Sequence, residues 1–212
     1  TATGARIMLA AGGAFEQAYT GQLAGDCESR LITAAYVTQA GNDKQQIEPM
    51  IGKLATLPSE LAVCEALLAD TGYYSAANVC ACAEARVTPL IAIKREHHQV
   101  SLNERFAADP LAPTVSTVST VSTVSTASPM GEEATATDTE AALVQMQHSL
   151  KTAAGRALYA LRKSTVEPVI GVIKHVMAFR QFSVRGLDRV DAEWSLVTLA
   201  YNVKRMNVLR IA

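Results

Sequence analysis

The stretch FEQAYTGQLAGDCESRLITAAYVTQA, residues 15–40, decides the fold. The segment GDCES interrupts it, and the pattern on either side predicts two strands joined at that point. The second strand, Leu31 to Thr38, is apolar and β-branched enough to be buried. Asp26 follows the first strand directly. Asp is rare inside strands but common at their ends, where it begins turns, so Asp26 marks the end of that strand.

The next part of the chain alternates between helices and strands. Apolar residues at helical spacing predict a helix over 44–57, and a second helix, capped by Ser75, is predicted over 76–85. Strands are predicted over 64–69, ending at Asp70, and over 87–93. Elements in this order predict an α/β fold with partly parallel strand pairing.

A low-complexity segment then interrupts the pattern. It contains four tandem Val-Ser-Thr triplets at 115–126, whose period of three fits neither a strand nor a helix. We interpret residues 111–138 as a solvated insertion or linker. Residues 139–212 have helical periodicity, with helices expected up to about 161, over about 166–179 and over about 188–209. The chain therefore divides into residues 1–110, the insertion, and a helical part over 139–212.

Charge is distributed unevenly along the chain. Residues 1–140 hold 8 Lys/Arg and 16 Asp/Glu, whereas residues 141–212 hold 11 Lys/Arg and 4 Asp/Glu. The basic C-terminal third fits a surface for a polyanion, although solvated helix faces would give the same composition. The four cysteines form no zinc-binding pattern and indicate a reducing compartment. No signal peptide is visible, and no apolar stretch approaches the ~18 residues that span a membrane.

Three carboxylates are candidates for chemistry: Asp26, Asp70 and Glu167. The aspartates end predicted strands, and Glu167 is the one acid in the run RKSTVEPVIGVIK, residues 162–174. Two strand-end aspartates and a helical glutamate can converge at the carboxyl edge of a sheet, where Mg²⁺ finds the oxygen ligands that it prefers. Two such ions ~4 Å apart would support phosphodiester cleavage.

Each carboxylate also has a structural explanation. The aspartates would serve as turn or cap residues. Ser164-x-x-Glu167 has the spacing of a capping box at a helix start, and an ion pair with Lys163 is another alternative. If residues 162–178 are instead one helix, Lys163, Glu167, Gly171 and Lys174 share a face, and Lys174 could meet a bound phosphate.

Three segments together resemble a known family. Residues 159–206, YALRKSTVEPVIGVIKHVMAFRQFSVRGLDRVDAEWSLVTLAYNVKRM, resemble the C-terminal catalytic block of bacterial insertion-sequence transposases of the DDE class. Residues 66–79, ALLADTGYYSAANV, and residues 12–50 are similar to the second- and first-aspartate segments of that family.

The resemblance implies a ribonuclease H-like mixed sheet with flanking helices and a long insertion before the C-terminal helices. It implies that Asp26, Asp70 and Glu167 form the catalytic, metal-binding triad. It further implies DNA strand cleavage and strand transfer with Mg²⁺ or Mn²⁺, by a homodimer bound to transposon ends and target DNA. Such a protein would be cytoplasmic and nucleoid-associated, without a membrane partner.

The family signature Y-x2-R-x3-E-x6-K implies DNA contacts for nearby cations. Glu167-x6-Lys174 fits the signature, and so does Tyr159-x2-Arg162. Arg162, however, lies five residues before Glu167, and Lys163 has the expected helical phase. Lys174 and either Arg162 or Lys163 are therefore the expected phosphate contacts.

Two alternatives to an active transposase domain stay open. One is a truncated, catalytically silent remnant that still binds DNA or dimerises. The other is a different nuclease or resolvase on the same fold, since a fold does not fix a function.

Overall fold

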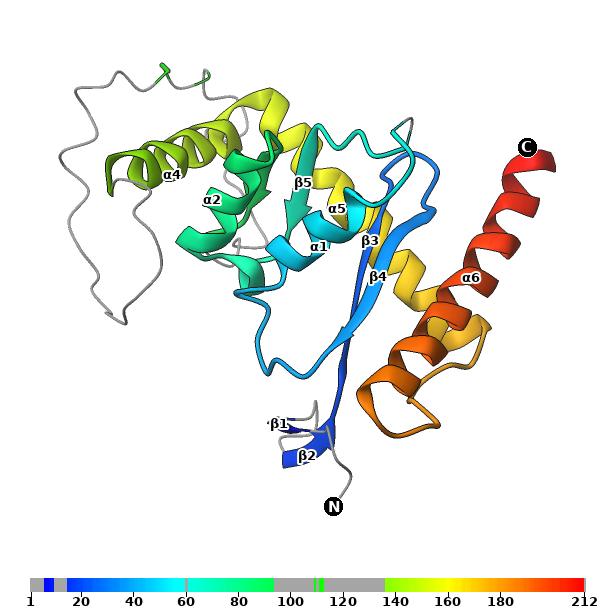
Figure 1. Cartoon of the computed structure of the whole chain (residues 1–212). Helices are drawn as coiled ribbons and strands as arrows, with labels where there is room; N and C mark the ends of the chain where they lie inside the picture. Colours follow the sequence, from blue (N-terminus) through cyan, green and yellow to red (C-terminus); the bar gives the residue numbers. More distant parts are fainter. Residues whose placement is uncertain are drawn as a thin grey trace. The chain divides into compact units, whose positions relative to one another are not determined.

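The computed structural model describes residues 6–9, 15–59, 61–93, 109, 111–112 and 136–211 (Figure 1). The chain forms two compact units: unit 1 comprises residues 1–63 and 160–212, and unit 2 comprises residues 64–159. Strands and helices are mixed in the described parts, which confirms an α/β protein. The Val-Ser-Thr triplets at 115–126 lie outside the described residues. Within the ranges given above, no helix is both long and apolar enough to cross a membrane.

Unit 1 is built on the predicted pair of strands. β3 (Thr20–Gly25) and β4 (Ile32–Thr38) are antiparallel, with Thr20 opposite Thr38. A register shift between Ala24 and Gly25 ends the regular pairing just before Asp26. The unit also contains a second antiparallel pair, β1 (Arg6–Leu9) and β2 (Phe15–Ala18), and the helix α1 (Ile47–Leu54). The prediction of two strands joined at GDCES is confirmed.

Helix α6 (Leu187–Ile211) packs along β4 (Figure 1). The core of unit 1 combines buried side chains of β4, of the helical segment before α6 and of α6 itself: Ile32, Val37, Val169, Ile173, Val190, Trp194 and Tyr201. The Trp194 indole N–H donates to the Gln22 carbonyl at 3.0 Å. A Cβ atom at Gly21 would lie 3.2 Å from Trp194 Cε2, so glycine at this position leaves room for the indole ring.

Side chains of α6 also bond the backbone of β4. Asp191 Oδ1 accepts from the Val37 N–H at 2.8 Å. Asn202 bonds both main-chain groups of Ile32, accepting from its N–H at 2.8 Å and donating to its carbonyl at 2.7 Å. An edge strand with unpaired backbone groups is a template for another strand, and a covering helix prevents that pairing. Helix α6 therefore takes the place that a third strand would have beside β4.

Unit 2 contains the predicted parallel pair. β5 (Ala66–Ala69) and β6 (Thr88–Ile91) are joined through η1 (Thr71–Tyr73) and α2 (Ala76–Glu84). Ser75 Oγ accepts from the Asn78 N–H at 3.2 Å, which confirms the predicted cap of α2. The described strands of the chain form three two-stranded sheets, so the single mixed sheet of a ribonuclease H-like fold stays a prediction.

The helices that follow residue 135 have other boundaries than expected. α4 spans Ala136–Lys151, α5 spans Ala153–Gly171, and a π-helical turn, η3, follows directly over Val172–Val176. The expected helix start near residue 166 is wrong. The break lies at Thr152, whose hydroxyl donates to the Ser149 carbonyl at 2.8 Å and accepts from the Gly155 N–H at 3.0 Å. A Cβ at Gly155 would lie 1.8 Å from the Ser149 oxygen, so this sharp junction requires glycine.

Candidate functional site

Asp26 lies exposed in the turn between β3 and β4. Its carboxylate accepts hydrogen bonds from the Ser29 N–H and the Ser29 hydroxyl, both at 2.6 Å. These bonds, the hydroxyl's first, hold the pKa of Asp26 below its usual value. The Asp26 N–H donates to the Leu31 carbonyl at 2.9 Å, and Arg30 adopts a left-handed conformation with φ of 58°. The turn thus presents an ionised carboxylate to solvent.

Two further side chains of α6 hold this turn. The Tyr201 hydroxyl donates to the Arg30 carbonyl at 3.0 Å, and Arg205 Nε donates to the Ser29 carbonyl at 2.7 Å. Burial raises the pKa of Tyr201, so its hydroxyl stays protonated at neutral pH and can donate. The backbone that carries Asp26 is therefore tied to a helix far away in the sequence.

Asp70 follows β5 in unit 2, as the sequence predicts. Its Oδ1 accepts from the Thr71 N–H at 2.5 Å, and the side chain begins η1. The structural explanation of Asp70 as a turn residue is therefore confirmed. This role is compatible with metal binding, because a carboxylate offers about four acceptor positions and the Asp70 side chain is exposed.

Glu167 lies exposed inside α5, four residues before its last residue, Gly171. Ser164 is inside the same helix, and its hydroxyl donates to the Leu161 carbonyl at 2.9 Å, so the capping-box explanation is wrong. Among the residues that the structure describes, no ion pair joins Lys163 to Glu167. Neither structural explanation of Glu167 holds, and its role as a metal ligand stays a prediction.

The segments that carry Asp26 and Glu167 meet within unit 1. A Cβ at Gly25 would lie 3.9 Å from Thr165 Cγ2, so the end of β3 approaches α5 at Thr165. Thr165 is 1% exposed. Glu167 comes two residues later and projects from another side of the helix, roughly 200° away at 3.6 residues per turn. The two backbone segments therefore lie close together, but this contact does not bring the Asp26 and Glu167 carboxylates together.

Asp70 belongs to unit 2, whereas Asp26 and Glu167 belong to unit 1. Over the described ranges, no group of three or more His, Cys, Asp or Glu side chains is gathered closely enough to hold a metal ion. The convergence of the three carboxylates stays a prediction.

Lys174 lies in the π-helical turn η3. A π-helical turn has i→i+5 hydrogen bonds and is wider than an α-helical turn, so it changes the helical phase after Gly171. The single face expected for Lys163, Glu167 and Lys174 therefore does not extend to Lys174. The Lys163 and Lys174 side chains are exposed, and Arg162 is half-buried.

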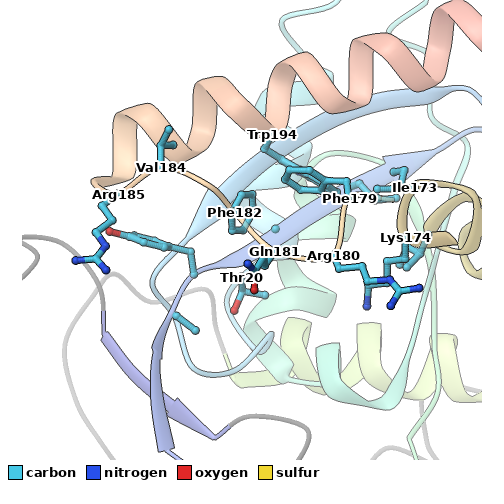
Figure 2. A pocket seen from close by; sticks show the side chains of 15 residues that line it. Thr20, Ile173, Lys174, Phe179, Arg180, Gln181, Phe182, Val184, Arg185 and Trp194 are labelled. Carbon is cyan, nitrogen blue, oxygen red and sulfur yellow. The ribbon is translucent and has the colours of Figure 1, made fainter. Parts of the chain in front are cut away.

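A cavity of about 670 Å³ opens in unit 1 beside Lys174 (Figure 2). Among the residues that the structure describes, its lining includes three cations, Lys174, Arg180 and Arg185, and no Asp or Glu. Figure 2 shows Lys174 and Arg180 together at one end and Arg185 at the other. The wall between them is aromatic: Phe182 meets Trp194 edge to face with ring centres 6.1 Å apart. Such a cavity favours an anionic ligand.

Of the three cations that line this cavity, the sequence analysis names Lys174 as a phosphate contact and does not name Arg180 or Arg185. The signal was present in the segment FRQFSVR, residues 179–185, where cations alternate with aromatic side chains. Basic residues interleaved with aromatic ones are typical of surfaces that bind nucleic acid strands.

Comparison with known protein families gives a match for part of the chain. Residues 123–207 match the family model described as Transposase DDE domain. The matched range contains Glu167, Lys174 and the α6 residues that hold the Asp26 turn, but neither Asp26 nor Asp70. No curated protein and no solved structure shows a significant match. The resemblance of this chain to the DDE-class transposases is therefore confirmed, through residues 123–207.

Proposed function

We propose that this chain carries the catalytic domain of a DDE transposase, which cleaves DNA and transfers the cut strand to a target. One observation carries the proposal: the segment that matches the family contains Glu167, an exposed acid whose structural explanations fail. The proposed partners are transposon-end DNA, target DNA and a second copy of the chain. The proposed location is the bacterial cytoplasm, in association with the nucleoid.

The donor chemistry of the three carboxylates fits Mg²⁺ or Mn²⁺. Asp26, Asp70 and Glu167 offer exposed carboxylate oxygens, the hard ligands that these ions take. Bound there, the ions would activate the attacking oxygen and stabilise the leaving one. Asp26, whose pKa is lowered by the hydrogen bonds from Ser29, is ionised at neutral pH, as a metal ligand must be.

The cations of the cavity are the proposed DNA contacts. Lys174 and Arg180 lie together, so they can neutralise the same stretch of backbone phosphates, and Arg185 extends the basic lining. Arg162 and Lys163 on α5 stay further candidates from the family signature. Contacts of this kind are independent of base sequence and weaken as salt rises.

A nicking assay tests the catalytic proposal. Supercoiled plasmid is incubated with the chain and Mg²⁺ or Mn²⁺, beside Asp26→Asn, Asp70→Asn and Glu167→Gln. We expect each variant to lose about 100-fold or more of the nicking rate, because each loses a charge that holds the metal ions. Asp188→Asn removes an exposed carboxylate of α6 and should nick as the parent chain does.

The outcomes separate the alternatives. Equal nicking by the parent chain and all three variants would contradict the metal triad. DNA binding without nicking by any protein would identify the silent remnant. Nicking without transfer of a labelled 3′ end to a second DNA would favour a nuclease or resolvase.

Arg180→Gln tests the DNA contacts separately. We expect it to weaken binding to duplex DNA of any sequence and to reduce the salt slope, −d log K/d log[salt], by about 0.9 for one lost phosphate contact. Arg210→Gln, which removes an exposed cation near the end of α6, is the control. Equal salt slopes for the two variants would remove Arg180 from the interface.

A further inference from the structure

Four hydrogen bonds tie the turn that carries Asp26, together with the first residue of β4, to α6. The Ser29 carbonyl accepts from Arg205, the Arg30 carbonyl accepts from Tyr201, and both main-chain groups of Ile32 bond Asn202. The donors and acceptors on α6 lie within five consecutive residues, 201–205. The turn is thus fixed at three of the residues that follow Asp26.

Ser29 connects this network to the carboxylate. Its N–H and its hydroxyl both donate to Asp26 Oδ2 at 2.6 Å, and its carbonyl accepts from Arg205 Nε at 2.7 Å. Arg205 therefore acts on Asp26 through one intervening residue. A displacement of the Ser29 backbone would move both donors to Oδ2 at once.

Oδ2 already accepts both hydrogen bonds from Ser29, so a metal ion at Asp26 would be met by the other oxygen, Oδ1. Because Ser29 holds Oδ2, the position of Ser29 sets the direction of Oδ1. Groups that orient a metal ligand typically change metal affinity or activity by about 10- to 100-fold when they are removed.

We propose that Arg205 and Tyr201 are positioning residues for a divalent metal ion at Asp26, acting through the backbone of Ser29 and Arg30. The inference rests on the proposed function for the identity of the ligand. It goes beyond it by assigning a role to two residues that neither the carboxylate pattern nor the family signature includes.

The network has two qualities that suit this role. Tyr201 is 5% exposed and packs in the core of unit 1, so its hydroxyl is held in place. Its partner, Arg30, has a left-handed conformation, with φ of 58°. A turn with such a conformation is held in one geometry by its surroundings.

The test uses variants that remove one hydrogen bond each. Tyr201→Phe deletes a hydroxyl and keeps the ring in the core. Arg205→Ala deletes the donor to Ser29, and Arg205→Lys restores a cationic donor there. Lys204→Ala is the matched control, because Lys204 is an exposed neighbour on the same helix with the same charge.

The first readout needs no catalysis. Mn²⁺ is titrated into ¹⁵N-labelled full chain without DNA, and the paramagnetic loss of the Ser29 and Arg30 amide signals gives its affinity at Asp26. We expect Arg205→Ala and Tyr201→Phe to weaken Mn²⁺ binding at least 5-fold, Arg205→Lys to recover part of it, and Lys204→Ala to leave it unchanged. Urea unfolding midpoints identify any variant that has simply lost its fold.

The second readout is the Mg²⁺ concentration for half-maximal nicking of plasmid DNA, which should rise in the same order. If the parent chain binds Mn²⁺ at the turn but does not nick, the proposed function fails while the positioning role stands. If a folded Arg205→Ala and a folded Tyr201→Phe bind Mn²⁺ as tightly as Lys204→Ala, the positioning role is overturned. Absence of Mn²⁺ binding by the parent chain would overturn it as well.

Discussion

The turns that carry Asp26 and Asp70 are built in different ways. Asp70 ends a strand of a parallel pair, and its carboxylate begins η1 by accepting from the next residue along the chain. Asp26 ends a strand of an antiparallel pair, and its turn is bonded by side chains of α6. The Asp70 turn is held by neighbours in the sequence, whereas the Asp26 turn has local bonds of its own and is held in addition by a helix from the far end of the described chain.

This difference indicates which substitutions should disturb the backbone around each carboxylate. A turn made from local hydrogen bonds keeps its form as long as its own residues are intact. A turn held from a distance loses its form when the distant helix changes. A substitution in α6 that removes a bond to this part of the backbone should therefore lower the free energy of unfolding more than a single substitution in the η1–α2 region does.

Asn202→Ala is expected to have the largest effect on stability. It removes the partner of both the N–H and the carbonyl of Ile32, a residue that is 7% exposed. We expect the free energy of unfolding to fall by about 2 kcal/mol, since buried polar groups are left unpaired. Urea denaturation measures it. Asn207→Ala, at an exposed position of the same helix, should cost far less, and equal losses would show that α6 does not support the strand.

Ser75→Ala gives the corresponding measure for local support in unit 2. It removes the oxygen that accepts from the Asn78 N–H at the start of α2. The expected loss is about 1 kcal/mol, the usual value of an N-cap. Ser75→Asp retains a capping oxygen and should restore most of it. A loss greater than that of Asn202→Ala would reverse the comparison.

The smallest expected effect is a change in acid sensitivity. Because the pKa of Asp26 is lowered in the folded chain, its ionised form stabilises the fold above the ordinary carboxyl pKa of about 4. That contribution is lost as pH falls through the lowered pKa. Ser29→Ala removes the largest cause of the shift, so it should destabilise the chain more at pH 6 than at pH 2.5. An equal loss at both pH values, measured by thermal unfolding, would contradict the assignment.

Local signals in the sequence predicted much of this structure. The strand pairs β3–β4 and β5–β6, the helix α1 and the Ser75 cap of α2 all depend on residues close together in the chain. The start of α5 was misjudged because Ser164, Glu167 and Pro168 have the pattern of a helix start. The helix instead continues through them, with its first turn closed at Thr152 and Gly155.

The candidate site was predicted less completely. Asp26 and Asp70 end their strands as expected, but the contacts of Arg205 and Tyr201 with the first turn join residues more than 170 positions apart. Neither a periodic pattern nor a short motif can predict a contact between residues so far apart in the sequence. The π-helical turn at Lys174 was also invisible, because the apolar residues around it fit an α-helix equally well.

The covering of β4 by α6 has a consequence for how the protein is made. β3 and β4 leave the ribosome early, whereas residues 187–211 are synthesised last among the described elements. Until α6 arrives, the bonding groups of Ile32 and Val37 that it occupies have no lasting partner, and such transient edges favour aggregation. A nascent chain stalled before residue 187 should therefore depend on chaperones or be degraded, even though both candidate-site aspartates, Asp26 and Asp70, have already been translated.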